Sequence, residues 1–250
     1  MNKKYAKPPL VEAVCEFRLS DDTKWDLTVA GLLYERVRNE FPIKEQRLFH
    51  QIEVLQSSQG LQQQQKTEER ALFFNEERSA FIQVGARMLA VNCLRPYPEW
   101  PGFRGYVNQG LAALKEVVDV RGVNRLGLRY INRIEIPNRP GSGTVDLEAY
   151  FDCRPFLGSR LPQEMAGFVL SVLLQFEGGR DNCKIVLSGA VAEKPNHQAF
   201  SLDIDYSTVA PLAVPPDKIG EWIDTAHRNL ESAFEGCIND SLRILFEEVK

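Results

Sequence analysis

The sequence predicts an α+β protein in which helices back a curved antiparallel sheet. The chain has 250 residues, 44% of them hydrophobic and 26% charged, which is ordinary for a globular protein with a core. Several segments alternate apolar and polar residues with the two-residue period of half-buried strands, and others repeat apolar residues at helical spacing. Similar elements recur in two halves, 1–120 and 121–250. We expect these halves to form one compact unit.

The first half has the predicted order β-α-β-β-β(β)-α. Its first strand alternates from Val11 to Leu19 and carries Glu12 and Glu16 on the outer face. Asp21 or Asp22 can cap a helix that ends at Pro42. The later elements are predicted as β-prone segments at 50–56, 71–75, 80–87 and 88–94, a glutamine-rich hairpin loop at 56–65 and a helix from Pro98 to about Val118.

The second half opens with the most regular strand of the chain, Asn124 to Ile136. Apolar residues occupy its even positions, and Arg125, Arg129 and Arg133 occupy odd ones. Successive arginines would lie about 13 Å apart on one face of the strand. We call these three residues the arginine row.

The remaining elements complete a second β-α-β-β-β-α order. They are predicted as a short helix at 145–151, strands at 168–176, 184–191 and 200–206, and a helix from Asp217 to Glu248. This last helix would be about 48 Å long, more than a domain of this size usually spans. We therefore expect part of it to pack against a second copy in a homodimer.

Two architectures fit this order of elements. One is a duplication like that of TATA-binding-protein folds, in which two such units join into one curved antiparallel sheet. The other is a helix-grip fold, in which a long C-terminal helix closes over a ligand cavity. Fold analogy of either kind implies no function.

Charge and composition narrow the classes of partner. The net charge is −4, so the field of the whole protein repels nucleic acid and anionic membranes, and any anion site has to be local. No signal peptide or membrane-spanning segment is predicted, and we expect a cytoplasmic protein. The five cysteines form no CxxC pair and the three histidines have no metal-ligand spacing, so we predict reduced thiols, no metal and no cofactor.

Three segments resemble a sporadically distributed family of bacterial and archaeal proteins of about this length. They are Lys7-Pro-Pro-Leu-Val-Glu-Ala-Val14, Val91-Asn-Cys-Leu-Arg-Pro-Tyr-Pro-Glu-Trp100 and Leu126-Gly-Leu-Arg-Tyr-Ile-Asn-Arg-Ile134. The resemblance implies a prokaryotic source and no particular activity. A sporadic distribution is typical of genes that move between genomes, such as defence and mobile-element genes.

The arginine row is the first candidate binding site. Guanidinium groups suit phosphate or carboxylate recognition, so the row would bind a nucleic acid or an acidic protein. Alternatively, Glu12 and Glu16 neutralise it by cross-strand pairing, which requires no function. Both interpretations stay open at this stage.

The other candidate binding or catalytic residues lie in a turn and on one face of a predicted helix. Tyr97 and Trp100, in Pro96-Tyr-Pro-Glu-Trp-Pro-Gly102, could stack on a base or a peptide proline, or could cover the core. Asp224, His227 and Glu231 lie three and four residues apart, a spacing that permits proton transfer but also describes a solvated helix face. The sequence ties no nucleophile to them, and we assign no catalytic residue.

Enzyme motifs are absent from the sequence: there is no P-loop, no GxGxxG after a strand and no GxSxG. Our leading hypothesis is a non-enzymatic binding or regulatory protein with a protein or nucleic-acid partner. The alternative is a protein that binds or transforms a small ligand in a cavity under the terminal helix, lined by Trp222, Ile223, Leu230 and Phe234.

Overall fold

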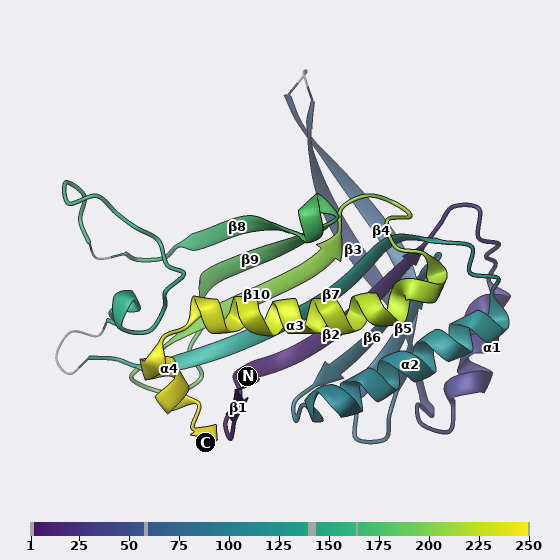
Figure 1. The fold of residues 1–250 in the computed structure, drawn as a ribbon, viewed down its shortest axis with the longest axis horizontal. Helices are drawn as coiled ribbons and strands as arrows, with labels where there is room; N and C mark the ends of the chain where they lie inside the picture. The colour runs from purple at the N-terminus through teal and green to yellow at the C-terminus, as the bar shows by residue number, and fades with distance from the viewer. Residues whose placement is uncertain (1–2, 58–59, 140–143, 164, 250) are drawn as a thin grey trace. The chain divides into compact units, whose positions relative to one another are not determined.

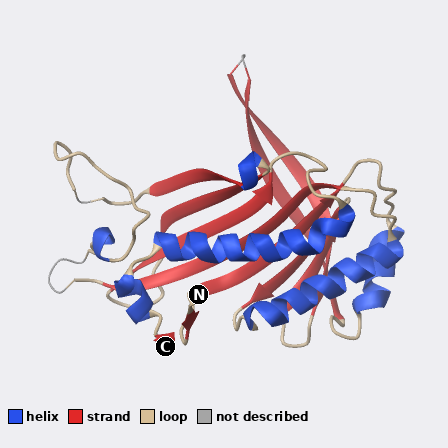
Figure 2. Ribbon diagram, viewed as in Figure 1, coloured by secondary structure: helices blue, strands red, loops and turns tan. Residues whose placement is uncertain are grey.

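The computed structural model describes residues 3–57, 60–139, 144–163 and 165–249, and the side chains of these residues except 50–57 and 60–66. It confirms the α+β class, with a large antiparallel sheet and helices that back it (Figures 1 and 2). The chain divides into two compact units. We call Val14–Leu126 the first unit, and Met1–Ala13 together with Gly127–Lys250 the second unit.

The first unit is a meander of strands with two helices. Its strand order is β3-β4-β5-β6-β2, in which β2 begins in the second unit. The elements are β2 (Leu10–Leu19), α1 (Thr28–Val37), β3 (Ile43–Ser57), β4 (Gly60–Phe74), β5 (Ala80–Gly85), β6 (Met88–Leu94) and α2 (Glu99–Val117).

Helix α2 covers β6 in the first unit because its apolar positions follow helical spacing. Phe103, Val107 and Leu114 are fully buried. Gly110 allows the close approach, since a Cβ there would lie only 3.0 Å from a methyl group of Val91 on β6. The packing resembles that of an ordinary soluble core.

The second unit carries the arginine row and the C-terminal helix. Its strand order is β2-β7-β10-β9-β8, and β7 begins in the first unit. Helix α3 packs along β10 (Figure 1). The elements are β1 (Lys4–Tyr5), β7 (Val123–Pro137), η1 (Leu147–Ala149), β8 (Val169–Phe176), η2 (Glu177–Gly179), β9 (Asp181–Ala190), β10 (His197–Thr208), η3 (Pro216–Lys218), α3 (Ile219–Cys237), α4 (Asp240–Leu245) and β11 (Glu248–Val249).

The predicted terminal helix of 32 residues is wrong, because the helix breaks after Cys237. Ile238 is extended and forms a β-bridge with Phe151, while the side chain of Asn239 accepts a hydrogen bond from the backbone N–H of Ser241 and caps α4. The apolar stripe continues through the break, so the sequence pattern did not reveal it. The length argument for a homodimer therefore no longer holds.

Two other boundaries also differ from the prediction. Helix α1 begins at Thr28, where the carboxylate of Asp26, and not that of Asp21 or Asp22, accepts the N–H of Thr28 at 2.8 Å. Of the expected loop at 56–65, residues 58–59 lie outside the described residues and the rest is strand, since Ser57 pairs with Gly60 and the β3–β4 ladder continues from there to Ile43 and Phe74. Main-chain pairing extends the hairpin whatever the polarity of its side chains.

The internal duplication stays a prediction. A 3₁₀ turn, Leu147–Ala149, stands in the second half where the first half has the helix α1. Among the helices of the described residues, none is both long and apolar enough to cross a bilayer.

Candidate functional site

Each arginine of the row faces a carboxylate. In the first unit, Arg125 donates to Glu16 at 2.7 Å. Burial acts to raise the pKa of Glu16, but the hydrogen bond from Arg18 and the charge of Arg125 hold that pKa below its ordinary value. Glu16 is therefore ionised and neutralises Arg125.

The other two arginines belong to the second unit and are paired there. Arg129 donates from Nε at 2.7 Å and from a terminal nitrogen at 2.5 Å to the carboxylate of Asp203 on β10, a bidentate contact. Arg133 lies 3.2 Å from Glu135 and 3.4 Å from Glu193. Of the pairing with Glu12 and Glu16 that the sequence left open, the structure shows the contact between Glu16 and Arg125, while Arg129 and Arg133 contact other carboxylates. The row therefore does not present a simple anion-binding surface.

Tyr97 and Trp100 flank the start of α2 in the first unit. Their rings lie 6.0 and 6.2 Å from the ring of Phe103, which is fully buried. Both side chains are half-buried. They cover the end of the core, which is the structural role considered for them.

His227 connects α3 to β7 within the second unit. Its Nδ1 lies 2.8 Å from the hydroxyl of Tyr130, and its Nε2 lies 3.2 Å from a carboxylate oxygen of Glu231. Burial lowers the pKa of His227 to about 4, so the imidazole is neutral at pH 7. Nδ1 then accepts from the Tyr130 hydroxyl and Nε2–H donates to Glu231.

A second buried polar group, Asp181, lies between the sheet and α3. It is fully buried, and its carboxylate accepts from Tyr206 and from Trp222 Nε1, each at 3.0 Å. Arg180 contacts the same carboxylate at 2.6 Å. Burial is the main cause that raises the pKa of Tyr206, so its hydroxyl stays protonated and donates. Together, Asp181 and His227 make the layer under α3 polar.

A groove of about 670 Å³ opens beside the ends of β9 and β10 in the second unit. Its volume falls in the range of ligand pockets. Small residues, Gly189, Ala190 and Ala199, line the strand side, and Phe156, Met165 and Phe168 line the loop side. Ion pairs Arg139–Asp146 and Arg154–Glu148 lie at the rim.

The groove lies where β9 extends beyond its neighbour. Strand β8 pairs with β9 from Phe176↔Asp181 to Val169↔Ser188, and Gly189 and Ala190 continue β9 past the last pair. Gly189 is exposed and Ala190 is half-buried, and neither has a ladder partner in β8. Such an uncovered strand end can pair with an added extended segment.

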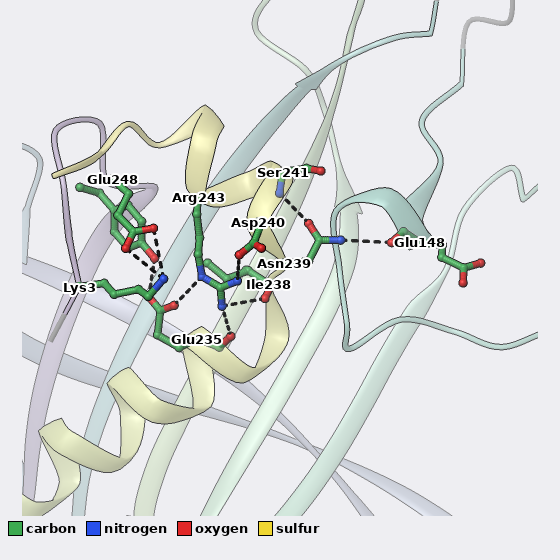
Figure 3. Close-up of polar contacts among 10 residues, drawn as sticks. Lys3, Glu148, Glu235, Ile238, Asn239, Asp240, Ser241, Arg243 and Glu248 are labelled. Atoms are coloured by element: carbon green, nitrogen blue, oxygen red, sulfur yellow. Dashed lines mark hydrogen bonds and ion pairs between the residues drawn. The ribbon is translucent and has the colours of Figure 1, made fainter. Parts of the chain in front are cut away.

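The break at the C-terminal end of α3 contacts Glu148, which lines the groove (Figure 3). Arg243 donates to the carbonyls of Glu235 at 2.8 Å and Ile238 at 3.1 Å, which satisfies carbonyls at the helix end. The amide of Asn239 donates to the carbonyl of Glu148, a groove residue, at 3.2 Å. The turn that follows Cys237 thus contacts the loop that lines the groove.

Strand β8 adds an apolar edge next to the groove. Val169, Leu173 and Leu174 are 74%, 61% and 40% exposed. The sequence Val169–Phe176, VLSVLLQF, contains no charged residue and no proline. β8 is the last strand of the hydrogen-bonded order in the second unit.

Sequence reasoning missed this groove, because its residues come from a loop at 139–168 and from the facing ends of β9 and β10, and no local pattern brings the loop to these strand ends. The alternation in 168–176 predicted the strand β8 but not its edge position. The residues of the alternative cavity lie elsewhere: Trp222, Ile223 and Leu230 are buried in the core, and none of these or Phe234 lines the groove.

Neither the arrangement of possible metal ligands nor comparison with known proteins assigns a function to the chain. Within residues 3–57, 60–139, 144–163 and 165–249, no three or more His, Cys, Asp or Glu side chains gather in a way that could hold a metal ion. Comparison of the chain with family models and with curated proteins gives no match. The resemblance to a sporadic prokaryotic family stays a prediction.

Proposed function

We propose that this chain is a non-enzymatic binding protein whose groove receives an extended, uncharged segment of a partner protein. The observation that carries this proposal is the groove of about 670 Å³ at the uncovered end of β9. Main-chain groups of an edge strand supply affinity for an extended segment, and a neighbouring pocket supplies specificity for one of its side chains.

The paired charges of the groove support an uncharged occupant. Its basic groups Arg139 and Arg154 already contact Asp146 and Glu148, so the rim is close to neutral. The floor of glycine and alanine leaves room for a side chain of the partner, and Phe156 and Met165 can contact it. Phe156 and Met165 are exposed, which is unfavourable unless a partner covers them.

A protein partner fits the charges better than a nucleic acid. The net charge is −4, and each of the three arginines of the row faces a carboxylate. Nucleic-acid binding depends on Lys and Arg that neutralise phosphates. The proposal therefore keeps the protein partner of the leading hypothesis and moves the contact surface from the arginine row to the groove.

The test is selection of peptides against the purified chain from a random phage-displayed library, followed by calorimetric titration of a selected peptide. Gly189→Phe should weaken binding at least about tenfold, because the new ring fills the groove. A Cβ at Gly189 meets no atom within 4 Å, so the variant should fold. Gly31→Phe, at another open glycine in α1, is the matched control.

Two results would contradict the proposal. One is a library that yields no peptide above background. The other is a selected peptide that binds Gly189→Phe as tightly as the unmodified chain. A ligand of a few hundred daltons that co-purifies with the protein and is lost in Gly189→Phe would assign the same groove to a small molecule instead.

A further inference from the structure

Strand β8 lacks the devices that normally protect a sheet edge. Exposed edge strands usually carry charged residues, proline or a bulge, because their unpaired main chain can pair with another chain. β8 has neither charge nor proline, and its register with β9 is regular over all eight residues, without a bulge.

Both faces of β8 carry apolar residues and are incompletely covered. On the face away from α3, Val169 and Leu173 are exposed and alternate with Ser171 and Gln175. On the α3 side, Leu170 and Val172 are half-buried and Leu174 is exposed, since α3 packs on β10 rather than on β8. A strand about 26 Å long thus presents apolar side chains on both faces beside an open main-chain edge.

We propose that β8 pairs antiparallel with β8 of a second copy of this chain, across a two-fold axis, to form a homodimer. The proposal does not depend on what the groove binds. Two-fold pairing places the same segment against itself, so any charge on the strand would face its own kind. The absence of charge from Val169 to Phe176 removes that repulsion.

The sequence of β8 also matches itself in register. A two-fold axis perpendicular to the sheet keeps each face continuous, so it opposes residues of the same face. With the axis at Leu173, Val172 faces Leu174 and Leu170 faces Phe176 on the α3 side, and Leu173 faces its own copy on the other side. Apolar cross-strand pairs of this kind stabilise a sheet.

The test is sedimentation equilibrium of the full chain at micromolar concentrations. We expect a mass of twice 28.4 kDa. Leu173→Lys and Leu173→Glu should each raise the dissociation constant at least about a hundredfold, because like charges would face each other across the axis. Leu48→Lys, on β3, is the matched control, since Leu48 is 63% exposed and Leu173 is 61% exposed.

A mixture of the two charged variants tests whether opposite charges at residue 173 restore the dimer. An equimolar mixture of Leu173→Lys and Leu173→Glu should recover the dimer mass, because opposite charges then meet at the pairing strands. A monomer at every concentration of the unmodified chain would overturn the proposal, and so would a dimer that Leu173→Lys leaves intact. Gly189→Phe should keep the dimer mass, which separates this proposal from the one for the groove.

Discussion

The two units differ in what they bury and in how their edge strands are protected. Among the described residues, the buried polar side chains of the first unit are neutral: Ser20, Thr23, Asn75 and Asn92. The second unit buries Asp181 and His227 as well as neutral groups. The edge strand β3 of the first unit carries Lys44, Glu45 and Arg47, whereas β8 of the second unit carries no charge. The first unit thus has neutral buried polar groups and a charged edge strand. The second unit has buried Asp181 and His227, a groove and an edge strand without charge.

The largest difference in stability should come from the buried carboxylate. Asp181→Ala leaves the Tyr206 hydroxyl and Trp222 Nε1 without their acceptor, and we expect a loss of about 3–5 kcal/mol in the free energy of unfolding. Asn75→Ala in the first unit, which loses the acceptor of the Ala80 N–H, should cost about 1–2 kcal/mol. Urea denaturation of both variants measures these losses in the free energy of unfolding. Equal losses would show that the buried polar groups of the two units do not differ in their contribution to stability.

The pH dependence of the free energy of unfolding should reveal the burial of His227 in its neutral form. The folded-state pKa of His227 is about 4, below its ordinary value of 6.5, so unfolding takes up a proton between these values. The contribution of His227 is complete above pH 6.5 and is lost as the pH falls toward 4, a change of about 3 kcal/mol. Burial raises the pKa of neighbouring Glu231, which acts in the opposite direction.

Comparison of the unmodified chain with His227→Gln isolates the contribution of His227 to the free energy of unfolding, because Glu231 is present in both proteins. The difference in the free energy of unfolding between the two proteins should shift by about 3 kcal/mol from pH 7 to pH 4. A difference that stays constant over this range would show that the imidazole is not buried in its neutral form.

The smallest effect is expected from the arginine row. Replacement of Arg125, Arg129 and Arg133 by Gln should lower the free energy of unfolding by about 1–2 kcal/mol, since ion pairs that are partly open to solvent contribute little. Binding of a peptide selected for the groove should change less than about twofold. Loss of that binding in the triple variant, with the fold retained by circular dichroism, would return the contact surface to the arginines.

Local patterns predicted much of the fold. The alternation of Leu126, Leu128 and Tyr130 gave β7, and helical spacing gave α2 almost to the residue, because a single buried face determines each pattern. The same logic failed at Ile238. An apolar residue there fits a helix stripe, but a β-bridge to Phe151 buries it instead.

The candidate site was harder to predict than the fold, because tertiary contacts create it. Glu16 and Arg125 are 109 positions apart, yet the outer-face pattern of both strands was enough to suggest their pairing as one of two interpretations. Nothing local marks Gly189 and Met165 as neighbours in one groove, or Val169–Phe176 as an edge. Strand position within a sheet depends on long-range pairing, which single-strand periodicity does not encode.

The most direct test of the second unit as the contact side is amide hydrogen exchange, followed by mass spectrometry at increasing protein concentration. Residues 169–176 of β8 and residues 43–49 of β3 are compared within the same molecule. We predict that exchange slows in 169–176 as the concentration rises, because β8 pairs with its copy, while 43–49 keeps its rate. Exchange in 169–176 that is independent of concentration, or protection that appears in 43–49 instead, would contradict the assignment of β8 as the binding edge.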